Sequence, residues 1–186
     1  MVTFNLIHAD WFHLLLNLLR QLLFGILLEC KYGSFRIVIV YWLSDVGAIL
    51  CAMLEDSRKG GIGASGAIYG LSLFFIIERL NAMKTNIDHR LFIVIQLILF
   101  VVFPMTIIIS SAAILGITVG HAAHFGGALV GFLFGIGMFG CPYPSNNNYF
   151  NFQMACRWIA FLFLFIYFVV TFTIFFLMDA PYVLQP

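Results

Sequence analysis

The chain has 186 residues, 63% of them hydrophobic and only 9% charged, with a net charge of +1 at pH 7. Because a typical soluble domain is about one quarter charged, this composition excludes a water-soluble globular fold and makes the lipid bilayer a necessary partner. The near-neutral charge gives no reason to expect nucleic acid as a partner. The four cysteines lack the paired spacing of a zinc or redox motif and are expected to be isolated thiols.

The apolar segments of the chain predict an all-α polytopic bundle of about six transmembrane helices. A helix needs about 20 mostly apolar residues to cross the hydrocarbon core of a bilayer. In chain order, the expected helices cover residues 11–28, 37–54, 65–77, 91–110, 120–139 and 158–178. Residues 141–157 are expected to form a cytoplasmic loop before the last of these helices.

The basic residues predict how these helices are oriented. The loops after the first, third and fifth helices hold Lys31, Arg36, Arg79, Lys84, Arg90 and Arg157. The loop after the second helix holds only Arg58 and Lys59, and Arg20 is not counted because it lies within the first helix. Loops rich in lysine and arginine stay in the cytoplasm, so the first, third and fifth helices are expected to start at the outer face.

Polar residues concentrate at the expected outer starts of these same three helices. They are His8, His13 and Asn17 at the start of the first, Ser65 at the start of the third, and His121 and His124 at the start of the fifth. Helices that run in the same direction bring such positions to a similar depth in the membrane. Polar side chains are costly inside a bilayer, which makes this group a candidate functional site.

Glycines predict close contact between the third and fifth helices. They recur at four-residue spacing, as Gly66 and Gly70 in the third helix and Gly127 and Gly131 in the fifth. Small residues at this spacing let two transmembrane helices approach closely. We therefore expect His124 to lie next to Ser65.

A serine beside a histidine within the membrane suggests nucleophilic catalysis. The hydroxyl of Ser65 becomes a good nucleophile when a base such as the imidazole of His124 accepts its proton. Ser65 closely follows Gly63 at the expected start of a helix, where free backbone N–H groups are available to an oxyanion. His13 and Asn17 are four residues apart and share one helix face, so they offer further hydrogen-bond donors.

No acidic residue is expected at this depth on the third or fifth helix. The serine and the histidine would therefore act as a dyad, without a carboxylate to orient the imidazole. Tyr69 lies one helical turn after Ser65, and its ring is expected to pack on the ring of His124 and hold it instead.

Four segments of the sequence resemble the motifs of rhomboid intramembrane serine proteases. They are HADWFHLLLN (8–17), ECKYGS (29–34), GASGAIYG (63–70) and AHFGGALVG (123–131). Their order, their spacing and their placement on helices agree with that family. The resemblance extends from about residue 3 to about residue 140.

This resemblance implies a serine-type endopeptidase in which Ser65 is the nucleophile and His124 the general base. Relatives without catalytic activity often carry a proline just before the serine or lack the serine and histidine. Here Ala64 precedes Ser65 and both residues of the dyad are present, which favours activity.

The same resemblance implies roles for the residues around the dyad. The side chains of His13 and Asn17 would form an oxyanion hole together with the backbone N–H of the serine. Tyr69 would stack under the histidine, while His8 and Gly63 would support the site.

Two features depart from the family pattern. A family core begins with a helix and a membrane-embedded loop that carries a Trp-Arg pair, whereas this sequence starts at the next helix. We therefore expect a rhomboid-like core over residues 1–140 that lacks its first helix. The helix expected over residues 158–178 resembles the additional C-terminal helix of secretory-pathway rhomboids, which implies a multi-pass protein of the secretory pathway or plasma membrane.

The predicted function is cleavage of transmembrane segments of other membrane proteins, with the oligomeric state left open. This function needs no metal or other cofactor. One alternative is a metal-dependent membrane hydrolase that uses several histidines, because histidine is a common zinc ligand. Its ligands would be His8, His13, His121 and His124, with only Asp10 nearby as an acid or base. A second alternative is a scaffold without catalytic activity that binds client membrane proteins, and the expected loss of the first core helix adds weight to it.

Overall fold

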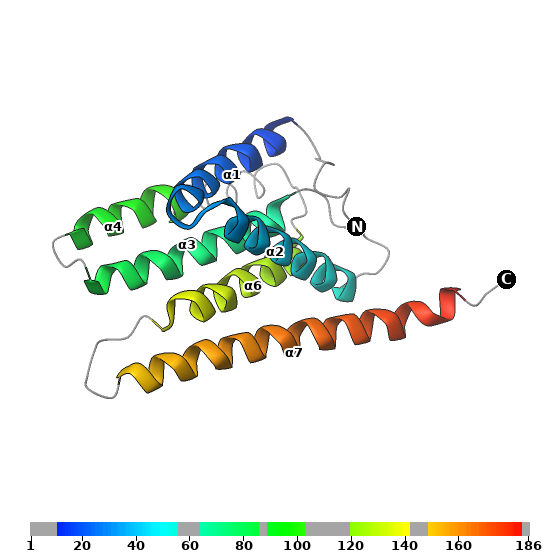
Figure 1. Ribbon diagram of the computed structural model, residues 1–186. Helices are drawn as coiled ribbons and strands as arrows, with labels where there is room; N and C mark the ends of the chain where they lie inside the picture. Colours follow the sequence, from blue (N-terminus) through cyan, green and yellow to red (C-terminus); the bar gives the residue numbers. More distant parts are fainter. Residues whose placement is uncertain (1–10, 56–63, 86–88, 103–119, 142–148, 184–186) are drawn as a thin grey trace.

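The computed structural model describes residues 11–55, 64–85, 89–102, 120–141 and 149–183 (Figure 1). Within these ranges the chain forms six α-helices and one π-helical turn, and no strand. They are α1 (Trp11–Tyr32), α2 (Ser34–Glu55), α3 (Ser65–Thr85), α4 (Arg90–Leu97), the π-helical turn η3 (Ile98–Val102), α6 (His121–Phe139) and α7 (Tyr149–Val183). The prediction of an all-α membrane bundle is confirmed.

Five of these helices are long and apolar enough to cross a bilayer, namely α1, α2, α3, α6 and α7. The fourth expected span is described only in its first part, as α4 and η3. The rest of that expected span, residues 103–110, lies outside the described residues. Large apolar side chains are exposed along the outer faces of α1, α4 and α7, as expected for helices that face lipid.

The last helix begins earlier than hydropathy predicts. It starts at Tyr149 rather than at residue 158, so part of the loop expected over residues 141–157 is helical. The polar side chains of this first part lower its hydropathy, but at least one of them is buried against the bundle. Gln153 is 8% exposed and donates a hydrogen bond of 2.9 Å to the carbonyl of Cys141, at the end of α6.

The turn between α1 and α2 is a single residue long. Gly33 alone separates the two helices, and its φ of 83° lies in the left-handed region that favours glycine. Its N–H donates to the carbonyl of Glu29 at 2.8 Å, which closes the end of α1. The turn reverses the chain and lays α2 beside α1.

Contacts between the helices establish their relative directions. Along α1 and α3, Arg20 contacts Ser72 and Phe24 contacts Phe75, and further on Tyr32 contacts Glu78, so these two helices run parallel. Helix α6 also runs parallel to α3, while α2, α4 and α7 run in the opposite direction (Figure 1). The N-terminal ends of α1, α3 and α6 therefore lie at the same end of the bundle.

Helix α3 is the centre of the packing. Its side chains Ile68, Leu71, Phe74 and Phe75 are at most 1% exposed, and they meet Phe24 and Leu28 of α1 and Val40 of α2. Lipid tails are as apolar as these side chains, so the packing is stabilised by close van der Waals contact more than by removal from water. This central position fixes the start of α3, where Ser65 lies.

Candidate active site

Ser65 and His124 meet at the shared end of α3 and α6. Ser65 is the first residue of α3, and His124 lies in the first turn of α6. The Ser65 Oγ and the His124 Nε2 are 2.9 Å apart, a hydrogen-bonding distance, although the two residues are 59 positions apart in the sequence. Both side chains are partly buried, so the pair is neither sealed in the core nor open on the surface.

Glycines on α3 and α6 make this approach possible. Gly127 packs against the backbone of Gly66, and Gly131 packs against the backbone of Gly70. A methyl group on Gly127 would lie 2.7 Å from the carbonyl carbon of Gly66, well inside ordinary van der Waals contact. The two helices are thus in backbone contact over one full turn directly after Ser65.

Helix α2 packs against the same part of α3 and also contacts α6. Ala48 and Ser44 lie against Gly66 and Gly70, in positions that a larger residue on α3 would occupy. Because α3 is in close contact with both α2 and α6, its first turn has little freedom to shift. Ser65 is therefore positioned by a rigid element and not by a loop.

The ring of Tyr69 stacks on the imidazole of His124. Their centroids are 4.2 Å apart and their planes differ by 10°. Tyr69 lies one turn after Ser65, so the contact with the serine and the contact with the tyrosine come from the same face of α3. Together they restrict both the position and the plane of the His124 ring.

The start of α3 leaves backbone donors available near Ser65. The N–H of Ile68 donates to the carbonyl of Ala64 at 3.1 Å, which makes Ala64 the residue that caps the helix. The N–H groups that precede Ile68, including that of Ser65, have no carbonyl within the helix to bind. Gly63 lies outside the described residues.

Helix α1 brings the amide of Asn17 toward the same region. Asn17 is 4% exposed, and no hydrogen-bond acceptor for its Nδ2 is found among the described residues. Because α1 runs parallel to α3 and Arg20 meets Tyr69 and Ser72, the turns that precede Arg20 lie level with the first turn of α3. Asn17 is on the turn just before Arg20, and the half-buried His13 is one turn earlier.

The remaining histidines of the sequence prediction are placed differently. His121 is the first residue of α6 and is exposed. His8 lies outside the described residues, as does Asp10. Within the part of the chain that the structure describes, no three histidine, cysteine or acidic side chains gather as they would around a metal ion.

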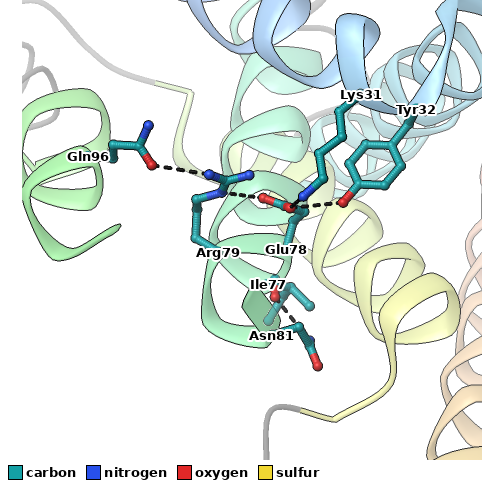
Figure 2. A network of polar contacts seen from close by, with 7 residues as sticks. All are labelled: Lys31, Tyr32, Ile77, Glu78, Arg79, Asn81 and Gln96. Atoms are coloured by element: carbon teal, nitrogen blue, oxygen red, sulfur yellow. Dashed lines mark hydrogen bonds and ion pairs between the residues drawn. The ribbon is translucent and has the colours of Figure 1, made fainter. Parts of the chain in front are cut away.

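Sequence reasoning missed a buried polar network at the other end of α3 (Figure 2). Glu78 is 2% exposed and pairs with Lys31 and Arg79, and its Oε1 accepts a hydrogen bond of 2.8 Å from the Tyr32 hydroxyl. Arg79 continues to the Gln96 Oε1 on α4, at 3.1 Å. The network ties α1, α3 and α4 together roughly 20 Å from Ser65 along α3, since a helix rises about 1.5 Å per residue.

Arg20 is a further residue to which the sequence analysis assigns no role. It was set aside because it lies within a span, yet it is 4% exposed and faces the site. Its guanidinium lies over the ring of Tyr69, 5.0 Å from the ring centroid. Its position three residues after Asn17, on the same helix face, is the signal in the sequence that points to it.

Comparisons with known proteins identify the family of the chain. A family model described as Rhomboid domain matches residues 1–141. RHOMBOID-like protein 5 of Arabidopsis thaliana is 31% identical over 69% of this chain and 40% of its own length. Rhomboid-like protein 11, chloroplastic, of the same plant is 35% identical over 70% of this chain and 49% of its own length.

A bacterial protein is also similar to this chain. Rhomboid protease AarA of Providencia stuartii is 29% identical over 70% of this chain and 52% of its own length. The chain thus spans about half the length of these relatives, or less. No solved structure gives a significant match. Because the family model covers more than half of the chain, this multi-pass membrane protein belongs to the rhomboid family.

Proposed function

We propose that the chain is a serine endopeptidase that cleaves transmembrane segments of other membrane proteins. Membership of the rhomboid family supports an intramembrane protease-like function in general terms. The observation that carries the specific proposal is the 2.9 Å contact between Ser65 Oγ and His124 Nε2, with the imidazole held by the stacked Tyr69 ring.

The proposed reaction begins with attack of the Ser65 Oγ on the carbonyl carbon of the scissile peptide bond. The hydroxyl proton passes to the neutral His124 Nε2, and the carbonyl oxygen becomes a tetrahedral oxyanion. When the intermediate collapses, the peptide C–N bond breaks and the imidazolium returns its proton to the departing amine. A water molecule then hydrolyses the acyl ester by the same steps and restores the serine.

The oxyanion is proposed to bind to donors that are already in place. The backbone N–H of Ser65 lies at a helix N-terminus, where the aligned peptide dipoles favour negative charge. The Asn17 Nδ2 is a buried donor for which no acceptor is found among the described residues, so it is available to donate a hydrogen bond to the oxyanion. His13, one turn earlier on α1, is the third proposed donor.

The position of the dyad restricts the substrates. Ser65 and His124 lie near one end of their helices, so the scissile bond must lie near one face of the membrane, the outer face by the distribution of basic residues. A peptide bond within a helix is shielded by its own backbone hydrogen bonds. We therefore propose substrates with glycine or other helix-weakening residues near that face.

The cellular membrane is a further part of the proposal. The additional helix α7 favours the secretory pathway or the plasma membrane by resemblance. A relative whose name is chloroplastic is among the matches, so other organelles are the alternative. Microscopy of a tagged full-length protein distinguishes them.

The proposal is tested by reconstituting the chain in liposomes with a single-span model substrate that carries glycines near one face. Ser65→Ala and His124→Ala are expected to lower cleavage by roughly 10⁴-fold or more, as for other serine hydrolases. A fluorophosphonate probe should label the wild-type chain and neither of these variants. Ser34→Ala and His89→Ala are control variants, because Ser34 also starts a helix, His89 lies directly before the start of one, and both are exposed.

Two results would contradict the proposal. Cleavage that survives Ser65→Ala but is lost with a chelator would favour the metal-dependent hydrolase. A wild-type chain that binds the substrate helix but neither cleaves it nor reacts with the probe would favour the scaffold without catalytic activity.

A further inference from the structure

A buried arginine lies beside the candidate dyad. Arg20 is on the α1 face that packs against α3, and it is 4% exposed. A charged side chain is expensive in the middle of a transmembrane helix, and those that occur usually face the bundle interior and serve a function. The proposed catalytic steps make no use of this residue.

The surroundings of Arg20 fix its guanidinium in one place. One of its Nη atoms donates a hydrogen bond of 3.2 Å to the Ser72 Oγ. The Ser72 hydroxyl in turn donates to the carbonyl of Ile68 at 2.8 Å, so its oxygen is oriented to accept from the arginine. The carbon at the centre of the guanidinium is then 5.0 Å from the centroid of the Tyr69 ring, within the range of a cation–π contact.

The Tyr69 ring connects Arg20 to the histidine. The ring is in contact with the guanidinium on α1 and stacks on the imidazole of His124 on α6 at 4.2 Å. Three side chains from three helices thus form a continuous stack that ends at the partner of Ser65. A planar, charged and hydrogen-bonded guanidinium restricts the tilt of the tyrosine ring, which an apolar side chain of similar length would not do.

We infer that Arg20 is a positioning residue for the dyad: through the Tyr69 ring it holds the plane in which His124 faces Ser65. The effect of Arg20 on catalysis rests on the proposed function. Its effect on the orientation of the His124 ring does not. The simpler alternative is that Arg20 only clamps α1 to α3. That alternative predicts loss of stability alone.

The chain offers a matched control for the clamp. Glu78 also ties α1 to α3, through Lys31 and Tyr32, but it lies at the far end of the helices and does not touch Tyr69. Glu78→Gln therefore weakens the same pair of helices without altering the stack. Comparing it with Arg20→Met, at matched loss of unfolding temperature, separates positioning from clamping.

The first measurement needs no enzymatic activity. In the full chain with labelled histidines, ring protons of His124 that lie over the Tyr69 ring resonate upfield, and His124→Gln assigns their signals. The upfield shift is expected in the wild type and in Glu78→Gln and is expected to be lost in Arg20→Met. Arg20→Lys keeps the charge but loses the planar group, so it should retain only part of the shift.

The second measurement is the rate at which a fluorophosphonate labels Ser65, together with kcat and KM for the model substrate. Arg20→Met should lower the labelling rate and kcat by about tenfold or more with little change in KM, because small displacements of a reacting group are costly. The inference is overturned if Arg20→Met and Glu78→Gln show the same upfield shift of the His124 ring protons and the same labelling rate of Ser65. A wild type that shows the shift but no labelling would refute the proposed function and leave the positioning role intact.

Discussion

Substitution of Gly127 by alanine tests the backbone contact that brings the dyad together. The new methyl group would lie 2.7 Å from the carbonyl carbon of Gly66 and closer still to its oxygen, whereas ordinary contact begins at 3.4 Å. Helices α3 and α6 must therefore separate by at least the difference, 0.7 Å. These are backbone atoms, so no side chain can turn aside to relieve the clash.

The displacement reaches the dyad because Gly66 directly follows Ser65 and Gly127 lies three residues after His124. Added to the 2.9 Å between Ser65 Oγ and His124 Nε2, a separation of 0.7 Å gives 3.6 Å, which is no longer a hydrogen bond. We expect kcat to fall by about 10²-fold, the cost of misplacing a reacting group by about 1 Å. Overpacking a helix contact should also lower stability by about 1–3 kcal/mol.

The assay is cleavage of the model substrate in liposomes, combined with thermal unfolding in detergent. Gly25→Ala is the control, since Gly25 also lies within a transmembrane helix but has no atom within 4 Å of the position of a new methyl group. If Gly127→Ala keeps wild-type activity and unfolds at the temperature of Gly25→Ala, the reasoning from helix contact to dyad geometry is refuted.

Two further predictions concern the residues around this contact. Asn17→Ala should lower kcat by about 10²–10³-fold, as for other oxyanion donors. The unfolding temperature should not change, because the Asn17 Nδ2 has no acceptor to lose among the described residues. If kcat in Asn17→Ala equals kcat in the exposed control Asn151→Ala, Asn17 is not part of the site. Glu78→Gln should lower the free energy of unfolding by about 1–3 kcal/mol, less than for a fully buried pair because Lys31 is 49% exposed. The exposed Glu55→Gln should change it little, and equal unfolding temperatures for the two variants would contradict the role of the network.

The spans and the meeting of Ser65 with His124 follow from simple properties of the sequence. Hydropathy predicts the long apolar helices, alternation of direction makes α1, α3 and α6 parallel, and glycine spacing allows two of them to touch. None of these steps requires knowledge of a side-chain partner. The chemical roles of the two residues stay predictions, because geometry alone does not establish a reaction.

The features that the sequence did not reveal all depend on distant partners. Helix α3 continues past residue 77 because the charge of Glu78 is compensated by Lys31 and Arg79, and hydropathy counts all three as unfavourable. The same holds for the first part of α7, where Gln153 donates to the carbonyl of Cys141, just after α6. The position of Arg20 is explained in the same way, because its guanidinium contacts the ring of Tyr69 on another helix.

The docking of α7 has a consequence for the direction from which a substrate arrives. The hydroxyl of Tyr167 donates to the carbonyl of Gly47 at 2.7 Å, and Phe161 packs on Gly137, so α7 covers the side formed by α2 and α6. Helices α1 and α4 form the opposite edge of the bundle (Figure 1). Under the proposed function, a substrate helix that diffuses in the plane of the bilayer cannot approach the bundle from the side that α7 covers.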